Sequence, residues 1–132
     1  MTSTATFSDP ERPRTTRVCF QLQIMPELLD EYTARHTPVW PEMLAEIAAS
    51  GRRNYSLFVD EAGRLVGYYE TDDDAAAQAY LAASAVAARW ESQMGHFFVD
   101  LDGRPDQAAQ PLTEVFNLEN QLTAATKESD AS

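Results

Sequence analysis

Alternation of apolar and polar residues predicts a strand near the start of the chain. In residues 17–24, RVCFQLQI, the apolar side chains of Val18, Phe20, Leu22 and Ile24 share one face. The residues between them are small or polar and fall on the opposite face. This period of two is typical of a strand that buries one side against a core.

Apolar residues at helical spacing predict two helices after this strand, with a corner between them. The first begins at Pro26, a residue suited to a first helical turn, and runs to about His36. The second spans 41–50, and Gly51 is expected to end it. The predicted inward-facing residues are Leu28, Leu29 and Tyr32 in the first helix and Met43, Leu44 and Ile47 in the second.

The remaining elements follow from turn residues and alanine content. Two β-rich runs, 54–59 and 64–71, flank a glycine-containing turn and predict a hairpin. The alanine-rich run 72–94 begins with acids, which favour a helix N-terminus, and a break is expected near Ser84. A last strand is predicted over 112–118, LTEVFNL.

This order of elements is β, α(α), β, β, α(α), β. It predicts the ferredoxin-like α+β class, an antiparallel sheet with helices on one face. The other sheet face then lacks cover, and it is expected to carry Gln21, Gln23 and one of Tyr55 or Tyr68. Because a second copy of the same sheet is the simplest cover, we expect a homodimer.

Composition places one domain between two tails. Residues 1–16 and 119–132 are rich in Thr, Ser, Ala, Pro and charge without apolar periodicity, so both are expected to be mobile. Residues 17–118 form the expected single domain. A lone cysteine, Cys19, fits a reducing cytoplasm, and neither a signal-like apolar segment nor a membrane-spanning run is present in the 132 residues.

The charge balance excludes two classes of partner. Twenty-one acids against ten basic residues give a formal charge of −11. An acidic surface repels phosphate backbones and anionic lipid headgroups. We therefore expect neither nucleic acid nor a membrane as a partner.

The most informative chemistry lies at the corner between the first two helices, in the stretch EYTARHTPVWPEM. His36 is expected at a helix C-terminus, where the negative end of the dipole favours the protonated imidazole. Tyr32 lies one turn earlier on the same face, and Trp40 follows around a corner bent by Pro38 and Pro41. A phenol, an indole and a titratable imidazole suit a sugar cleft. The plainer alternatives are a helix cap, a core tyrosine and a packing tryptophan.

Other candidate sites are weaker. Val86, Trp90 and Met94 recur at a spacing that is usually a core stripe. A metal site would have to join His36 and His96 through carboxylates without any ligand-spacing motif, so no metal is expected. The chain has no dinucleotide, phosphate-loop or nucleophile-elbow motif, and no cofactor is expected.

Four motifs together resemble the L-rhamnose mutarotase family. They are EYTARHTPVWPE at 31–42, NYSLF at 54–58, RWESQM at 89–94 and LTEVF at 112–116, and the resemblance covers 17–118. It implies a cytoplasmic dimeric α+β barrel that interconverts the α and β anomers of L-rhamnose or a similar monosaccharide without a cofactor.

The resemblance also implies roles for individual residues. His36 would be the proton donor to the ring oxygen, with a rate that falls as pH rises through its pKa. The sugar-contacting residues would be Tyr32, Tyr55 and Trp90, joined by Trp40 from the corner and by Glu91. Glu91 stands where some members have a second tryptophan. The partner base stays open among water, Asp100, Asp102 and Glu91.

Two other classes of function compete with a mutarotase. Small dimeric barrels also include cofactor-free and haem-linked monooxygenases, in which His36 could be an axial ligand. A non-catalytic sugar-binding module would leave His36 as a helix cap.

Overall fold

The computed structural model describes residues 15–99 and 109–131, with side chains described through 126. The predicted N-terminal tail at 1–16 lies almost wholly outside this range, as do Asp100 and Asp102. Four antiparallel strands form one sheet in the order β2-β3-β1-β4. The strands are β1 Thr16–Gln23, β2 Arg53–Val59, β3 Arg64–Thr71 and β4 Gln110–Leu112.

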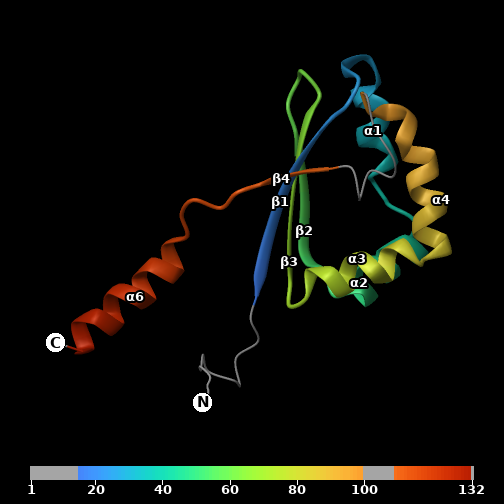
Figure 1. Cartoon of the computed structure of the whole chain (residues 1–132). Helices are drawn as coiled ribbons and strands as arrows, with labels where there is room; N and C mark the ends of the chain where they lie inside the picture. The colour runs from blue at the N-terminus through green and yellow to red at the C-terminus, as the bar shows by residue number, and fades with distance from the viewer. Residues whose placement is uncertain (1–14, 100–108, 132) are drawn as a thin grey trace.

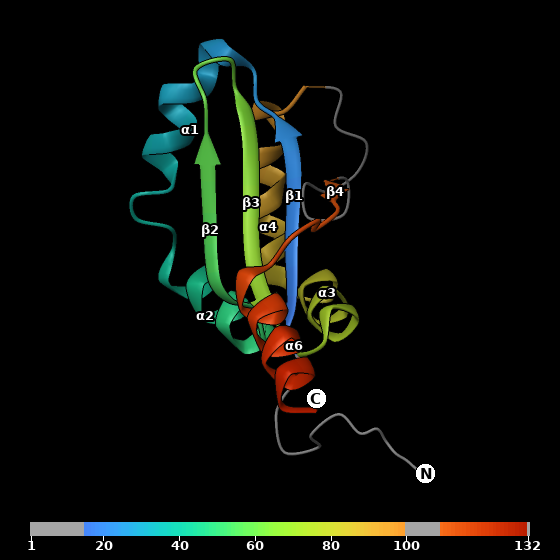
Figure 2. The same cartoon turned by 90° about the vertical axis from the view of Figure 1, so that its left-hand side faces the viewer.

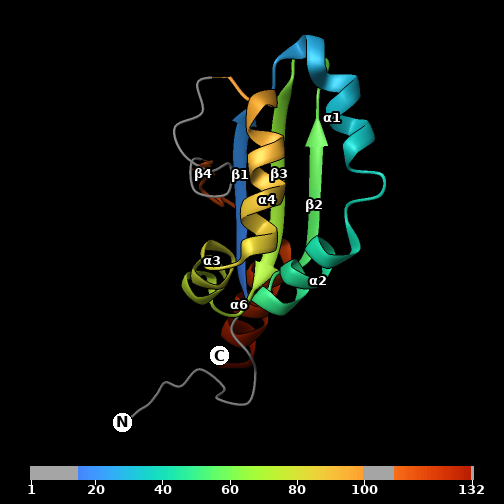
Figure 3. The same cartoon turned by 90° about the vertical axis from the view of Figure 1, so that its right-hand side faces the viewer.

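Helices cover one face of this sheet. They are the short 3-10 turn η1 Pro26–Leu28, α1 Leu29–Arg35, α2 Pro41–Ser50, α3 Asp74–Ala82, α4 Ala85–Met94 and η2 Gly95–Phe97. A further helix, α6 Leu118–Ala131, follows at the C-terminal end and lies outside this layer. Figures 1 and 3 show α1 to α4 on the same side of the sheet. Strand order and layering confirm the predicted ferredoxin-like α+β fold.

The local stop and start signals account for the helix boundaries. Gly51 adopts a φ of 99° at the end of α2, a left-handed conformation that glycine accepts without strain. Ser84 breaks the alanine-rich run as predicted, because its side chain accepts a hydrogen bond from the Ala87 amide and caps α4. Asp73 caps α3 in the same way.

Two predictions about the fold are wrong. The last strand is Gln110–Leu112 and not 112–118, since only those residues pair with β1. Leu44 is 51% exposed and does not join the core. Residues 118–131, which include most of the predicted C-terminal tail at 119–132, form helix α6. Asn117 starts this helix by accepting a hydrogen bond from the Asn120 amide at 2.9 Å.

The strand register separates the two sheet faces. Val18 lies opposite Tyr69, and both belong to the helix-covered face, where Tyr69 is 3% exposed. Cys19 lies opposite Tyr68, so Tyr68 is the tyrosine of the uncovered face. We call this second face the outer face; Figure 2 views the molecule from its side.

The densest core lies between the sheet and the α1, α4 and η2 helices. Phe97 and Ile24 are fully buried there, and Leu65 is 1% exposed. The Met25 amide donates a hydrogen bond to the Phe97 carbonyl at 2.8 Å, which ties the end of β1 to η2. Over the ranges described, no helix is both long and apolar enough to cross a bilayer.

Gly63 in the β2–β3 turn provides a test of this packing. Its φ is +89°, and a Cβ there would lie 2.2 Å from the Ile24 carbonyl oxygen. We expect Gly63→Ala to lower the free energy of unfolding by about 2 kcal/mol or more, since the left-handed conformation alone costs ~1–2 kcal/mol for an L residue.

The matched control is Gly95→Ala. Gly95 has helical angles, and a methyl group added there would meet no neighbouring atom within 4 Å. This change should be neutral or stabilising by up to ~1 kcal/mol. Urea unfolding of both variants measures the difference, and equal effects would contradict the steric role of the turn.

Candidate functional site

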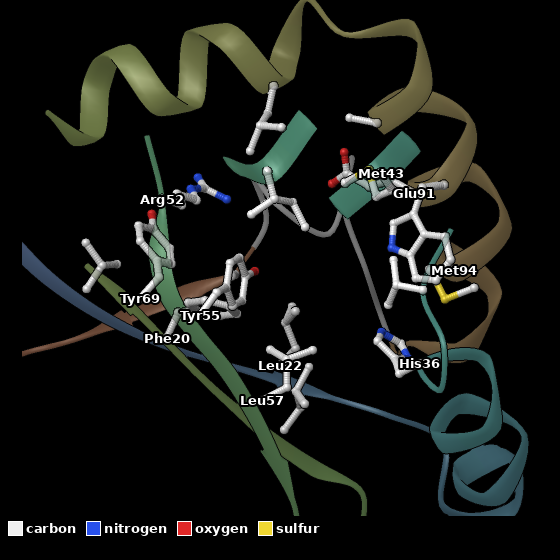
Figure 4. Close-up of a pocket in the computed structure, with 18 of the residues that line it drawn as sticks. Phe20, Leu22, His36, Met43, Arg52, Tyr55, Leu57, Tyr69, Glu91 and Met94 are labelled. Carbon is white, nitrogen blue, oxygen red and sulfur yellow. The ribbon is translucent and has the colours of Figure 1, made fainter. Parts of the chain in front are cut away.

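A pocket of about 540 Å³ opens between the helix-covered face of the sheet and the helices. It is lined by apolar residues of β1 to β3 and by side chains of α1, α2 and α4. Figure 4 shows Arg52, Tyr55 and Tyr69 on one side of the space and His36 and Met94 on the other. Glu91 reaches the pocket from the same side as Met94.

His36 sits at the C-terminal end of α1, where its ring is fixed by one hydrogen bond. The ring Nδ1 lies 2.7 Å from the backbone carbonyl oxygen of Tyr32. A carbonyl oxygen can only accept, so Nδ1 must carry the proton. In the neutral ring the lone pair therefore resides on Nε2, on the other side of the imidazole.

Burial decides the charge of His36. Removal from water lowers the pKa of the imidazole below its ordinary value, and this outweighs the opposing effect of the Tyr32 carbonyl. The sequence pointed to a helix end that favours the protonated ring, whereas the net shift of the His36 pKa runs the other way because burial is its largest cause. The His36 ring is half-buried and lies against the rings of Tyr32 and Trp90.

Aromatic rings surround His36. The Tyr32 ring centroid lies 4.3 Å from that of His36, and the Trp90 ring meets His36 edge-on at 5.4 Å. Tyr32 is itself held between Phe97 and Phe98 at 5.5 and 5.8 Å. Burial raises the pKa of the Tyr32 phenol, which therefore stays protonated near neutral pH.

Trp40 is placed differently from the other predicted site residues. Tyr32, His36, Tyr55, Trp90 and Glu91 all line the pocket, whereas Trp40 is not among its lining residues. Its ring packs edge-on against Trp90 at 5.1 Å. Trp40 therefore supports Trp90 from behind.

The sheet contributes a second aromatic group to the pocket. The Tyr55 ring lies 5.2 Å from Tyr69 and 6.3 Å from Phe20. The Tyr69 hydroxyl donates a 2.5 Å hydrogen bond to Asp74, which fixes the ring at the start of α3. Tyr55 thus has a position on the pocket floor that is set by its neighbours.

Two charged residues are buried in this aromatic setting. Arg52 is 4% exposed, with its guanidinium carbon 4.2 Å above the Tyr69 ring. Glu91 is 7% exposed on α4. Charged groups so deeply buried are rare outside functional or paired settings.

Sequence reasoning missed Arg52. The arginines at 52 and 53 follow the helix stop at Gly51 and look alike in the sequence. The structure buries the first and leaves the second exposed, bonded to Asp72 at 2.9 Å. The left-handed Asn54, with φ 52°, and the irregular pairing between Arg53 and Ser56 turn the two side chains apart. The sequence could have predicted that Arg52 is buried and Arg53 exposed only if it had predicted the bulge in β2.

A metal centre gains no support from the described part of the chain. Within it, no three His, Cys, Asp or Glu side chains are grouped so as to hold an ion. His96 is exposed and packs on Phe97 at 4.1 Å. The chemistry of the pocket therefore rests on imidazole, phenol, indole, guanidinium and carboxylate groups.

Comparisons with known proteins agree with one another. The family model for L-rhamnose mutarotase matches residues 17–118. An L-rhamnose mutarotase of Oceanobacillus iheyensis is 33% identical over 101 residues, covering 76% of this chain and 95% of the relative. One from Yersinia pestis is 35% identical over 106 residues, covering 78% and 98%.

A solved structure extends this likeness to three dimensions. The crystal structure of an L-rhamnose mutarotase from Formosa agariphila matches with a TM-score of 0.64 at 25% identity, over 78% of this chain and 98% of that one. Sequence, fold and pocket lead to the same conclusion. The chain belongs to the L-rhamnose mutarotase family, a family of isomerases.

Proposed function

We propose that this chain interconverts the α and β anomers of L-rhamnose, or of a closely related monosaccharide, by opening and closing the sugar ring. The observation that carries the proposal is the fixed tautomer of His36, which keeps Nε2 available in an aromatic pocket. Membership of the family favours this activity over a monooxygenase or a non-catalytic sugar-binding module.

The reaction requires two proton transfers that cancel. A base takes the proton of the anomeric hydroxyl, C1=O forms as the bond from C1 to the ring oxygen breaks, and the ring oxygen takes a proton. Rotation about C1–C2 and the reverse steps then give the other anomer. Because no net proton is gained or lost, one imidazole can accept the first proton and return it as the second.

The lowered pKa of His36 supports one order for these transfers. A neutral His36 at pH 7 begins as the base through Nε2 and becomes the donor once it is an imidazolium. This refines the role that the resemblance implied, in which His36 is only the donor. General acid–base catalysis by one group contributes ~10²–10⁴ in rate, and positioning in the pocket supplies more.

The two sides of the pocket then have different tasks. The anomeric carbon lies at the His36 side, between Tyr32 and Trp90, whose flat rings confine the sugar. Arg52, on the opposite side, binds hydroxyl groups remote from the anomeric carbon, and Glu91, which enters from the side of Met94, binds a hydroxyl group nearer to His36, since charged groups make the stronger hydrogen bonds to such partners. Tyr55 bounds the sugar on the sheet side.

We further propose a homodimer that uses the outer face, in the cytoplasm. Phe58 is 65% exposed and Leu112 is 41% exposed, and both belong to the outer face by strand register. A second copy of the sheet would cover this face, and a stable contact would bury ~1,200 Å² or more.

The first prediction concerns His36→Asn. Asparagine can still donate a hydrogen bond to the Tyr32 carbonyl but cannot exchange a proton, so kcat should fall ~10²–10⁴-fold with little change in melting temperature. Magnetisation exchange between the anomeric proton signals of L-rhamnose measures the rate directly. His96→Asn, an exposed control, should retain wild-type exchange. Normal exchange in the His36 variant would remove it from the mechanism.

The second prediction is the direction of the pH profile. Burial disfavours the imidazolium, so the pKa of His36 lies below the ordinary value of ~6.5. The neutral ring is the active form in the free enzyme, and kcat/KM should therefore rise with pH through this pKa and level off above it. A rate that instead declines across this range would show that the imidazolium is the active resting form.

The third prediction concerns Glu91→Gln, which keeps the shape of the side chain and removes its charge. Loss of charge-assisted hydrogen bonds worth ~1.5–3 kcal/mol should raise KM by roughly 10- to 100-fold, with a smaller effect on kcat. Glu42→Gln on the exposed side of α2 is the matched control. An unchanged KM in a variant that melts normally would exclude Glu91 from substrate binding.

A further inference from the structure

The C-terminal arm, residues 113–126, is built unlike the rest of the chain. It continues β4 away from the sheet and ends in helix α6. Figure 1 shows α6 standing out on the side opposite to α1–α4, clear of the domain, and Figure 2 shows it in front of the sheet when the outer face is viewed. None of the α6 side chains described, 118–126, is buried.

This arm is nonetheless apolar at regular positions. Val115 is 90% exposed and Phe116 is 60% exposed, and Leu118 and Leu122 are each 53% exposed. The two leucines are four residues apart and share one face of α6. Several large apolar side chains exposed on one segment are typical of a surface that contacts another molecule.

An isolated helix of this length gains too little from its own hydrogen bonds. The 14 residues of α6 fall in the range where helices in water are marginal without tertiary contacts. The arm therefore needs a surface to pack on, and its own domain offers none where it stands. A surface on another chain would supply this contact.

The start of the arm indicates which chain would cover it. Glu114 forms two hydrogen bonds with Arg17 of β1, at 2.7 and 3.1 Å. Arg17 lies opposite Glu70 in the sheet register, on the outer face. The arm thus starts on the face that lacks cover and carries exposed Phe58, and it then leaves its own sheet.

We propose that the arm packs across the outer face of a second copy of this chain, so that two exchanged arms clasp a homodimer. A two-fold axis that brings the two outer faces together also carries each arm onto the partner, so that the sheet contact and the two arms cover the apolar surfaces jointly. This inference rests on the homodimer proposed above. The region matched by the family model ends at 118, where α6 begins, so the helical part of the clasp lies outside the matched domain.

The test is the dimer dissociation constant of the full chain, measured by sedimentation over a dilution series. The variant Leu118→Glu/Leu122→Glu places two charges on the apolar face of α6. The control Asn120→Glu/Thr123→Glu adds the same charge to the opposite face. All four residues are exposed, so neither variant should disturb the domain fold.

We expect the wild type and the control to be dimers at micromolar concentration. The leucine variant should dissociate with a constant raised roughly 100-fold or more, since two apolar side chains are lost from each arm. Equal dissociation constants for all three proteins would overturn the clasp and leave the sheet-face dimer standing. A wild type that is monomeric at micromolar concentration would overturn both.

Discussion

The hydrogen bond from the His36 ring to the Tyr32 carbonyl is the interaction on which the site depends. It fixes the tautomer of the imidazole, and so it fixes which nitrogen can exchange protons with a ligand. Tyr32 can hold this position because its ring is packed between Phe97 and Phe98. Packing in the core thereby fixes the position of the His36 imidazole in the pocket.

The aromatic surroundings of His36 also shift its pKa. The aromatic rings of Tyr32 and Trp90 exclude water from the imidazole and lower its pKa, which makes the neutral form the resting one. Arg52 lies on the opposite side of the pocket and Glu91 enters it from the side of Met94, and both side chains are buried. The pocket thus combines a region that suits proton exchange with a region that suits hydroxyl recognition.

Local patterns predicted the elements well, and non-local contacts account for the errors. The i, i+4 spacing of Tyr32 and His36 and the stop at Gly51 are local, and the structure confirms them. The burial of Arg52 depends on a bulge in β2 and on Tyr69 across the sheet, which no local pattern encodes. The direction of the His36 pKa shift could not be read from the sequence, because it is set by burial, which is not local. Apolar residues at 115 and 116 suggested a strand, but they lie on an arm beyond the sheet.

The tautomer of His36 at pH 7 tests this mechanism most directly. Nitrogen NMR of histidine-labelled protein, with His96→Asn to assign the two rings, distinguishes the forms by the shifts of Nδ1 and Nε2. We predict a neutral His36 that carries its proton on Nδ1, with Nε2 unprotonated. A ring protonated on Nε2 alone, or on both nitrogens at this pH, would contradict the mechanism.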